Sequence, residues 1–393
     1  MALGRTLGVP IFQEQVMQIA MLAAGFSAGE ADELRRAMAA WRRKGGLGPF
    51  HHKVIHGMVA RGYTREFAES IFRQIEGFGE YGFPESHAAS FALLVYVSCW
   101  LKKHHPDAFL VGLLNAQPMG FYAPAQLVED AKRHGVQVQP VDVCLSEAKT
   151  VLENISVHQW AVRLGLHMVS GLSSAGVRNI IQARQTKAFD SCEDLVKRAE
   201  LNRSDLQALA AADALRSLSK HRHQAQWDVS GLDTHKDLLK ESRTQESNVA
   251  LPSPTIAETV FADYASIGLS LTQHPIALIR HQLPVSGIRS AKELKYYPDK
   301  RPARACGLVT HRQRPSTAKG TVFITLEDET GQVNVIVWPE LLERQRDILL
   351  NSQVMAVFGI WQKQGEVRHL LAKRVLDLSQ LFNALKLQAR NFQ

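Results

Sequence analysis

The chain has 393 residues, of which 45% are hydrophobic, and it carries a formal net charge of +8 with a pI near 9.3. This hydrophobic content is ample for globular cores, the length predicts roughly two to four domains, and the positive charge favours a polyanionic partner. The four cysteines are far apart and form no CxxC pair, so neither a zinc site nor a disulfide framework is indicated. A reducing cytoplasm fits this cysteine usage, and the first residues lack the apolar core of a signal peptide.

A basic window without any acidic residue extends from Leu34 to Arg65. Arginine and lysine supply charge-assisted donors, so this window predicts a phosphate-bearing partner, although most charge runs are solvated helix faces. The window contains eight basic side chains, namely Arg35, Arg36, Arg42, Arg43, Lys44, Lys53, Arg61 and Arg65.

A helix is predicted to carry the first half of this window. Ser27 and Glu30 have the spacing of a capping box, so the helix should run from about Ala28 to Lys44 and stop at the following glycines. Arg35 and Arg42 are two turns apart and share a face, and Arg36 and Arg43 form an adjacent stripe. The four guanidinium groups would then form a ladder matched to successive phosphates.

A second helix is expected after Gly77-Phe-Gly-Glu-Tyr-Gly-Phe. Ser86 is predicted as its N-cap, and His87 would then donate to a phosphate or a base edge at a helix N-terminus, although a histidine in this position is otherwise a capping or packing residue. The mostly apolar run from Ala88 to Leu101 is too short for a bilayer, which needs about 20 residues, and predicts a buried core helix. Cys99 within it should be inert packing.

Further helices and a hairpin pattern follow. The segment up to His134 predicts a helix with Gly135 as its C-cap, and an extended stretch comes next. Gly171 and Gly176 suit a helix–hairpin–helix turn, in which glycine lets backbone N–H groups approach a DNA phosphate, and Arg178 and Arg184 would add charge. The other interpretation is an ordinary helical corner. A second copy, AELNRSDLQALAAADAL, has no glycine hairpin and is expected to be structural.

The last third of the chain changes from helical to alternating patterns. Three strands, a short helix and two more strands are expected, which is the order of an OB-fold. Arg312, Arg314 and Lys319 fall in or beside the loop after the first strand, where OB-folds grip single strands. Phe323 is either a base-stacking residue or part of the barrel core.

Two blocks of this sequence resemble the fingers of bacterial family C DNA polymerases, the DNA polymerase III alpha group. The first block extends from Leu3 to Leu47 and includes FQEQVM and LRRAM, and the second extends from Gly77 to Phe109 and includes YGFPESHAASFA. The ending WRRKGGL is closest to the error-prone, damage-inducible branch. The family also has a closely similar stretch after Gly112, a tandem helix-hairpin-helix unit at this place, and GLSLTQHP before its OB-fold.

The resemblance implies a multidomain α+β chain, with mainly α-helical fingers and a tandem helix-hairpin-helix region followed by an all-β OB-fold barrel. We expect partial fingers at residues 1–110, a connecting segment at 111–160 and the hairpin region at 161–227. A polar linker at 228–260 and a pre-OB segment at 261–298 should follow. The OB-fold is expected at 299–380 and a tail at 381–393.

The implied activity is template-directed addition of deoxynucleotides during synthesis over damaged DNA. The dNTP-contacting residues would be Arg35, Arg36, Arg42, Arg43, Lys44, Ser86 and His87. The hairpin unit, with Gly171, Gly176, Arg178 and Arg184, would grip duplex primer-template. The OB-fold, with Arg312, Arg314, Lys319 and Phe323, would hold single-stranded template.

In this family palm aspartates hold two metal ions, Mg²⁺ in the full enzyme, and they precede the fingers. No acidic cluster of the chain has that context, because Glu327-Asp328-Glu329 is assigned to a hairpin turn. We therefore expect no catalytic residue in this chain and no synthesis by it alone. Two other hypotheses are a non-catalytic DNA-binding protein and a non-functional remnant. Accessory proteins of the mutagenesis system could recruit the sliding clamp, since Gln380-Leu-Phe382 is a poor clamp motif.

Overall fold

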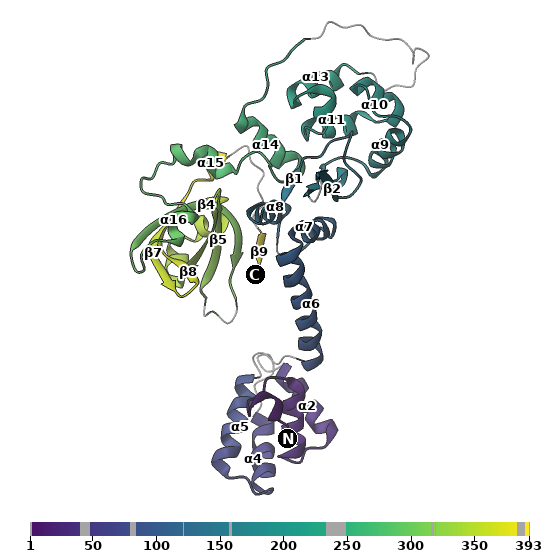
Figure 1. Cartoon of the computed structure of the whole chain (residues 1–393). Coiled ribbons are helices and arrows are strands. Elements are labelled where there is room, and N and C mark those ends of the chain that lie inside the picture. Colours follow the sequence, from purple (N-terminus) through teal and green to yellow (C-terminus); the bar gives the residue numbers. More distant parts are fainter. Residues whose placement is uncertain are drawn as a thin grey trace. The chain divides into compact units, whose positions relative to one another are not determined.

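The computed structural model describes residues 2–39, 48–78, 84–120, 122–156, 159–232, 249–315, 318, 320–382 and 390–392. The chain divides into two compact units, Met1–His104 and His105–Gln393 (Figure 1). We call them the amino-terminal unit and the carboxyl-terminal unit.

The amino-terminal unit is helical. Its core forms because apolar residues recur at helical spacing, as in α5, where Ala68, Ile71, Phe72 and Ile75 are all buried. Its described elements are η1 (Gly4–Thr6), α1 (Gln13–Leu22), α2 (Ala28–Ala39), α4 (Gly48–Val59), α5 (Arg65–Phe78) and α6 (Glu85–His104).

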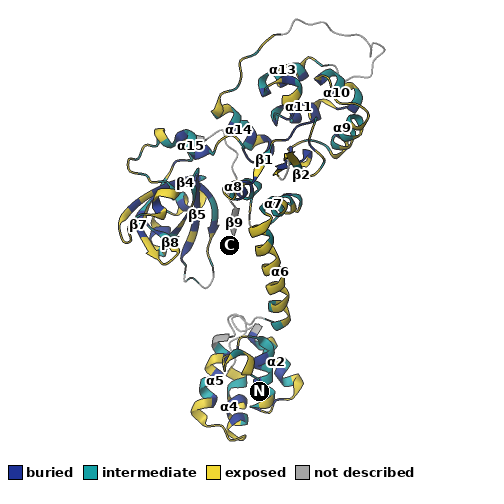
Figure 2. Ribbon diagram, viewed as in Figure 1, coloured by how far each residue is buried: buried dark blue, intermediate teal, exposed yellow. Residues whose placement is uncertain are grey.

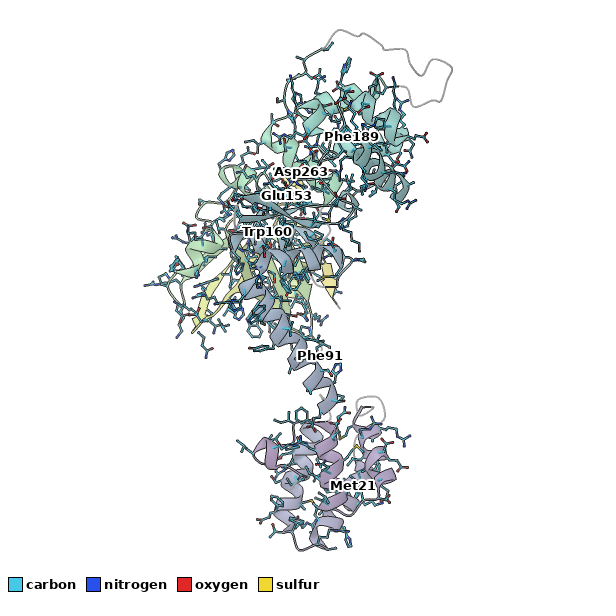
Figure 3. The ribbon with its side chains drawn as sticks, turned by 45° about the vertical axis from the view of Figure 1, so that its right-hand side comes forward. Met21, Phe91, Glu153, Trp160, Phe189 and Asp263 are labelled. Atoms are coloured by element: carbon cyan, nitrogen blue, oxygen red, sulfur yellow. The ribbon has the colours of Figure 1, made fainter. Side chains whose placement is uncertain are left out.

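Helix α6 contradicts the prediction of a buried core helix. None of its residues is buried; Leu93 is 67% exposed, and Cys99 is exposed and not packed (Figure 2). The described core of this unit is built from residues before α6, so it closes without this helix. The side chain of Phe91 extends from the helix in Figure 3. Apolar residues surround α6 on all sides instead of forming one stripe, so the sequence pattern does not indicate which face is to be covered.

The carboxyl-terminal unit begins with two helices on a small sheet. Strand β3 lies between β1, to which it is parallel, and β2, to which it is antiparallel. Gly135, with a φ of +85°, ends the first part as predicted, because it follows helix α8 in the left-handed conformation. The elements are α7 (Pro106–Asn115), α8 (Pro124–Arg133), β1 (Gln137–Gln139), β2 (Val151–Ser156) and β3 (Gln159–Arg163).

A run of short helices follows and shares one apolar core with this sheet. The carboxylate of Asp263 in α14 accepts from the buried Arg222 of α13 at 2.5 Å, so the last helix is tied to the others. The elements are η2 (Leu166–Met168), α9 (Ser174–Thr186), α10 (Cys192–Ala199), α11 (Arg203–Ala211), α12 (Arg216–Ser219), α13 (Arg222–Ser230) and α14 (Ile256–Ile267).

The polar linker expected at 228–260 is shorter at both ends. Helix α13 continues to Ser230, and α14 starts at Ile256 behind a capping box of Thr255 and Glu258. Residues 233–248 of this stretch lie outside the described residues.

The expected OB-fold is present as a closed barrel. Strand β5 pairs with β6, β6 with β8, β8 with β7, β7 with β4, and β4 with β5 again. Val333, Val335 and Val337 point into the core, as their alternation predicts. The elements are α15 (Pro275–Ile279), η3 (Arg280–Gln282), α16 (Ala291–Lys295), β4 (Pro302–Gln313), β5 (Val322–Asp328), β6 (Gly331–Val337), α17 (Pro339–Arg344), α18 (Arg346–Asn351), β7 (Val354–Gln364), β8 (Val367–Asp377), η4 (Ser379–Phe382) and β9 (Arg390–Phe392).

Candidate nucleic-acid interface

Two arginines of α2 share one internal partner. Arg35 donates through Nε to Asp32 Oδ1 at 2.9 Å, and Arg36 Nε lies 3.1 Å from Asp32 Oδ2. The hydrogen bond from Arg35 holds the pKa of the Asp32 carboxyl below its usual range. Because Asp32 stands about one turn before the two arginines, it pairs with both guanidinium groups and offsets one of their two charges. The two side chains remain partly exposed and able to meet a phosphate.

The rest of the predicted ladder cannot be placed. Arg42, Arg43 and Lys44 lie outside the described residues, so the alignment of Arg35 with Arg42 and of Arg36 with Arg43 stays a prediction.

The capping box at the start of α2 is confirmed. Ser27 N–H donates to Glu30 Oε2 at 2.8 Å, and Glu30 N–H donates to Ser27 Oγ at 3.4 Å. Glu30 also accepts from Lys53 of α4, and this hydrogen bond, with those from Ser27, lowers the pKa of Glu30 to about 2. Lys53 belongs to the basic window that predicts a phosphate-bearing partner, but in the structure it pairs with Glu30 and joins two helices of its own unit.

The start of α6 differs from the prediction for Ser86. The helix begins at Glu85, so Ser86 is its second residue and not its N-cap. Glu85 N–H donates to Glu14 Oε2 at 2.9 Å, and the Glu85 carboxylate pairs with Arg5 at 2.6 Å. Two carboxylates therefore already occupy the positive end of this helix, where the phosphate was expected. His87 is exposed, and its ring lies 4.4 Å from that of Phe91, so its nucleotide contact stays a prediction.

In the hairpin region, the first glycine has the turn conformation that the pattern implies, and its contact with a DNA phosphate stays a prediction. Gly171 is exposed and has a φ of +85°, a left-handed conformation that favours glycine in a tight turn. It precedes α9, whose N-cap is Ser173.

Gly176 does not offer its backbone to phosphate. It is buried inside α9, and its N–H donates to Ser173 Oγ at 2.9 Å. The buried Asp205 of α11 accepts from Ser173 N–H at 2.7 Å and from Ser173 Oγ at 3.0 Å. A Cβ at Gly176 would come within 2.8 Å of Asp205 Oδ2, so glycine is needed here for helix packing. The predicted DNA role of this glycine is wrong in its physical basis, because a carboxylate already stands at the N-terminus of α9.

The second hairpin copy forms the same kind of turn without glycine. Glu200, between α10 and α11, adopts a φ of +47°, and Asn202 then caps α11 by accepting from Asp205 N–H at 2.8 Å. The sequence shows that this copy lacks the hairpin glycine. It does not show that Glu200 takes the left-handed conformation in its place, because glutamate rarely does so.

The two arginines of α9 have different surroundings. Arg178 is exposed, as a DNA contact requires. Arg184 is mostly buried and donates to the carbonyl oxygens of Val143 and Ser146 at 3.0 and 2.9 Å, and to Glu147 at 2.8 Å. The prediction that Arg184 contacts DNA is therefore wrong for this structure: it braces the loop after β1.

Arg312 is likewise internal. It is buried, donates through Nε to Leu349 O at 2.7 Å and through its terminal nitrogen to Ser352 O, and so satisfies carbonyl groups at the end of α18. Burial lowers the pKa of Arg312 to about 10. A side chain held in this way cannot also grip a single strand, so the prediction for this residue is corrected.

Arg314 and Phe323 stay available for a ligand. Arg314 is exposed, and Phe323 is 37% exposed on the outer side of β5, where it pairs with Ile336 of β6. The alternative that Phe323 belongs to the barrel core is wrong. Lys319 lies outside the described residues.

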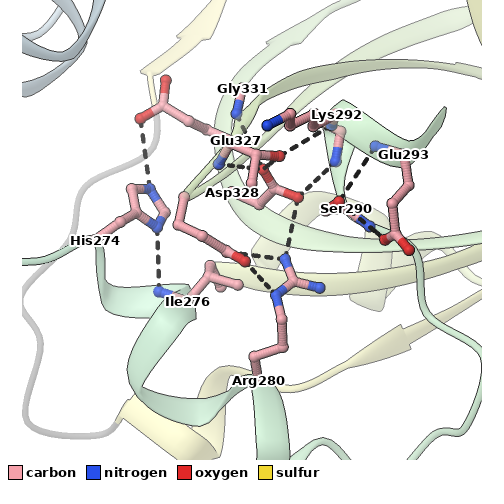
Figure 4. A network of polar contacts seen from close by, with 12 residues as sticks. His274, Ile276, Arg280, Ser290, Lys292, Glu293, Glu327, Asp328 and Gly331 are labelled. Atoms are coloured by element: carbon pink, nitrogen blue, oxygen red, sulfur yellow. Dashed lines mark hydrogen bonds and ion pairs between the residues drawn. The ribbon is translucent and has the colours of Figure 1, made fainter. Parts of the chain in front are cut away.

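The acidic run Glu327-Asp328-Glu329 is engaged in a structural network (Figure 4). Asp328 accepts from Gly331 N–H at 3.0 Å, which forms the predicted turn, and from Arg280 at 3.1 Å. Glu329 pairs with the same arginine.

His274, at the end of GLSLTQHP, joins this network. It accepts from Ile276 N–H at 3.2 Å as the N-cap of α15, and its Nε2 lies 3.6 Å from Glu327 Oε1. Burial pushes the pKa of Glu327 upward, but its hydrogen bonds with His274 and Gln332 outweigh this effect and leave it below the usual range. Sequence reasoning gave this histidine no role, and the His-Pro step before a helix was its only signal.

Metal binding and membrane insertion are two other classes of function. Across the described ranges, no three His, Cys, Asp or Glu side chains form a group that could hold a metal ion. None of the described helices has the length and apolar character needed to cross a membrane.

Three family models match the chain in order. The bacterial DNA polymerase III alpha subunit finger domain matches residues 1–62, a helix-hairpin-helix motif matches 135–225, and an OB-fold nucleic acid binding domain matches 303–378. In these three stretches the chain is therefore similar to the finger domain of a bacterial DNA polymerase III alpha subunit, to a helix-hairpin-helix motif and to a nucleic-acid-binding OB-fold.

The relatives are more specific. The chain is 57% identical over 386 residues to the error-prone DNA polymerase of Bordetella parapertussis, a match that covers 98% of the chain and 37% of the relative. The error-prone DNA polymerase of Burkholderia pseudomallei is 55% identical over 396 residues, again with 37% of the relative covered. The chain is thus homologous, along almost its whole length, to a part of the error-prone DNA polymerases. It spans little more than a third of the length of these relatives.

Proposed function

We propose that this chain provides the nucleotide- and DNA-contacting part of an error-prone DNA-directed DNA polymerase that acts in damage-induced translesion synthesis and mutagenesis. One observation carries the proposal: the fingers, the hairpin region and the OB-fold follow one another in a chain that aligns over 98% of its length with error-prone DNA polymerases. The matched domains favour DNA as the polymer that is bound.

The proposed roles follow the exposed basic residues. Arg35 and Arg36 contact the triphosphate of the incoming nucleotide, and Arg42, Arg43, Lys44 and His87 complete this site. The hairpin turn at Gly171 and the exposed Arg178 contact the phosphates of duplex primer-template. Arg314, Lys319 and Phe323 hold single-stranded template on the barrel, with Phe323 stacked on a base.

The catalytic carboxylates are proposed to lie elsewhere in the enzyme. Polymerases of this kind use metal ions, with Mg²⁺ expected, to stabilise the attacking and leaving oxygens. In this chain Asp328 and Glu329 are bound by Arg280, and Glu327 by His274, so these acids are not arranged to hold a metal ion. We therefore expect no primer extension by the chain alone when primer-template, dNTPs and Mg²⁺ are supplied. We further propose that mutagenesis accessory proteins bind the enzyme and recruit the sliding clamp, and that the enzyme acts in the cytoplasm.

DNA binding tests the proposal directly. In fluorescence anisotropy with a labelled primer-template, the affinity of the whole chain should fall linearly with the logarithm of salt concentration. Replacing Arg178 and Arg314 together with alanine should reduce the magnitude of the salt slope by about two, since each exposed cation contributes about one. The matched control is Arg346→Ala, an exposed arginine of α18 outside the proposed interface. A salt-independent affinity, or an equal effect of the control substitution, would contradict the proposal.

A further inference from the structure

A recessed region lies on the OB-fold, and Arg314 is not among its lining residues. It is a cavity of about 410 Å³ between helix α16, the turn that joins β5 to β6, and the hairpin of β7 and β8. This volume is within the range of small-ligand sites, about 300–1,000 Å³.

The cavity exists because two strands diverge. Strands β6 and β8 pair at Val335↔Leu370 and Ile336↔Leu371. The lining residues Gln332 and Asn334 precede these pairs on β6, Arg368 precedes them on β8, and Glu366 lies in the turn just before β8. Helix α16, which lies outside the barrel strands, contributes part of the lining.

The lining is electropositive. It includes Lys292 and Lys295 from α16 and Arg368 from β8, against one carboxylate, that of Glu366. Arg368 lies 3.4 Å from Glu366, whose side chain is almost fully exposed. Three cations and one carboxylate leave a surplus of positive charge for an anionic group.

Two buried donors in the wall have no acceptor. The indole Nε1 of Trp361 and the Nε of Arg368 make no hydrogen bond with any part of the chain that the structure describes, and Trp361 is only 3% exposed. Unsatisfied buried donors are rare in folded proteins, because they lose water without gaining a partner. Both side chains line this cavity, so a ligand bound there would change the surroundings of the Trp361 indole.

The wall of the cavity is held in place before any ligand enters. Ala291 N–H donates to Asp328 Oδ2 at 2.8 Å, Lys292 N–H donates to Thr330 Oγ1 at 3.0 Å, and Gly331 N–H donates to Asp328 Oδ1 at 3.0 Å. Figure 4 shows Lys292 and Gly331 within this network, in which the Asp328 carboxylate accepts from Gly331. A preformed wall reduces the entropy lost on binding.

We propose that this cavity binds one nucleotide unit, with its phosphate at Lys292, Lys295 and Arg368. Tyr296, which lines the cavity and is 77% exposed, offers a ring on which the base stacks, and Asn334 offers an amide for the base edge. Asn334 also lies on the same outer face as Ile336, which pairs with Phe323, so a single strand held at Phe323 would extend toward the cavity. The inference thus deepens the proposed single-strand role of the barrel.

The test uses the unpartnered indole as its reporter. The whole chain is labelled with ¹⁵N-tryptophan, and the Trp361 resonance is the one that disappears in Trp361→Phe. Deoxyadenosine 5′-monophosphate should shift this resonance with saturation. The double substitution Lys292→Glu with Lys295→Glu should raise Kd at least about tenfold, because both charges at the phosphate are reversed. The control is Lys373→Glu with Arg346→Glu, which makes the same charge change at exposed positions outside the cavity and should alter Kd less than about twofold.

Each outcome bears on the proposal. A shift by an oligothymidylate without terminal phosphates identifies a strand as the source of the nucleotide, and a shift by the mononucleotide alone identifies a free nucleotide; both support the site. The proposal is overturned if deoxyadenosine or inorganic phosphate alone shifts the Trp361 resonance at the same concentration as the mononucleotide. It is also overturned if the control substitutions raise Kd as much as the lysine substitutions do. A shift by an acidic peptide without a shift by the nucleotide would overturn it too. Unchanged resonances of the other tryptophans show that the variants are folded. Salt-dependent DNA binding by the chain is measured separately, so failure of either proposal can be recognised by itself.

Discussion

At the scale of single residues, Arg312 shows what decides whether a cation faces a ligand or the protein. Its guanidinium group donates to carbonyl oxygens of Leu349 and Ser352 at the end of α18. Arg312→Ala would leave these buried acceptors unpaired and should lower the free energy of unfolding of the barrel by about 2–4 kcal/mol. Hydrogen exchange of barrel amides measures this change. The exposed neighbour Arg314→Ala should change it by less than about 0.5 kcal/mol, and equal effects of the two substitutions would contradict this role of Arg312.

The pKa of Glu30 gives a pH-dependent prediction. Its folded pKa of about 2 lies below the ordinary value of 4.5, chiefly through the hydrogen bond from Lys53. A carboxyl group with a lowered folded pKa contributes stability above its unfolded pKa, and this contribution is lost as pH falls from about 4.5 toward 2. In an NMR titration of the Glu30 carboxyl, Lys53→Ala should raise the pKa toward 4.5, while Lys102→Ala, in α6, should leave it unchanged. An unchanged pKa in Lys53→Ala would show that the cap alone sets it.

Residue type predicted which side chains are charged, but not where their partners lie. Arg184 and Arg312 find theirs in segments 37 or more positions away in the sequence, which no local pattern reveals. Asp32, in contrast, stands three and four residues before Arg35 and Arg36, so its ion pairs follow from helical spacing and could have been foreseen.

At the scale of elements, α9 depends on a glycine for packing. In Gly176→Ala the new methyl group would meet the carboxylate of Asp205, which is held by two hydrogen bonds from Ser173. We expect this substitution to destabilise the hairpin region by about 1–3 kcal/mol, as overpacking of a core does. The same substitution at Gly29 in α2 has open space around it and should stabilise its helix by about 0.5–1 kcal/mol. Amide exchange in α9 and in α2 measures both effects, and stabilisation of α9 would show that Asp205 can move aside.

Elements with a strong local signal were predicted well. The capping box at Ser27, the C-cap at Gly135 and the alternating valines of β6 depend on neighbouring residues, and all three are present. The burial of α6 was not predictable from its own residues, because burial depends on what lies beside a helix and the apolar side chains of α6 point in all directions. The same holds for the candidate interface. The exposure of Arg178 and Phe323 depends on which segments pack beside them, so only the tertiary structure reveals it.

At the scale of the whole molecule, the two units should unfold separately. Phe72 and Leu370 are fully buried in different cores, one in each unit. Phe72→Ala should lower the stability of the amino-terminal unit by about 3–5 kcal/mol, and Leu370→Ala that of the barrel by about 2–5 kcal/mol. Hydrogen exchange monitored along the whole chain should show each loss within its own unit. Loss of protection in both units from either substitution would mean that they unfold as one.

The described apolar cores draw on successive stretches of sequence. One core lies between Val16 and Ile75, the next between Leu110 and Leu269, and the barrel clusters between Ile276 and Leu378. The buried residues of each core precede those of the next core in the sequence. During synthesis on the ribosome each core is therefore complete before the next has emerged, and the nascent chain can fold from its amino terminus onward without waiting for distant partners.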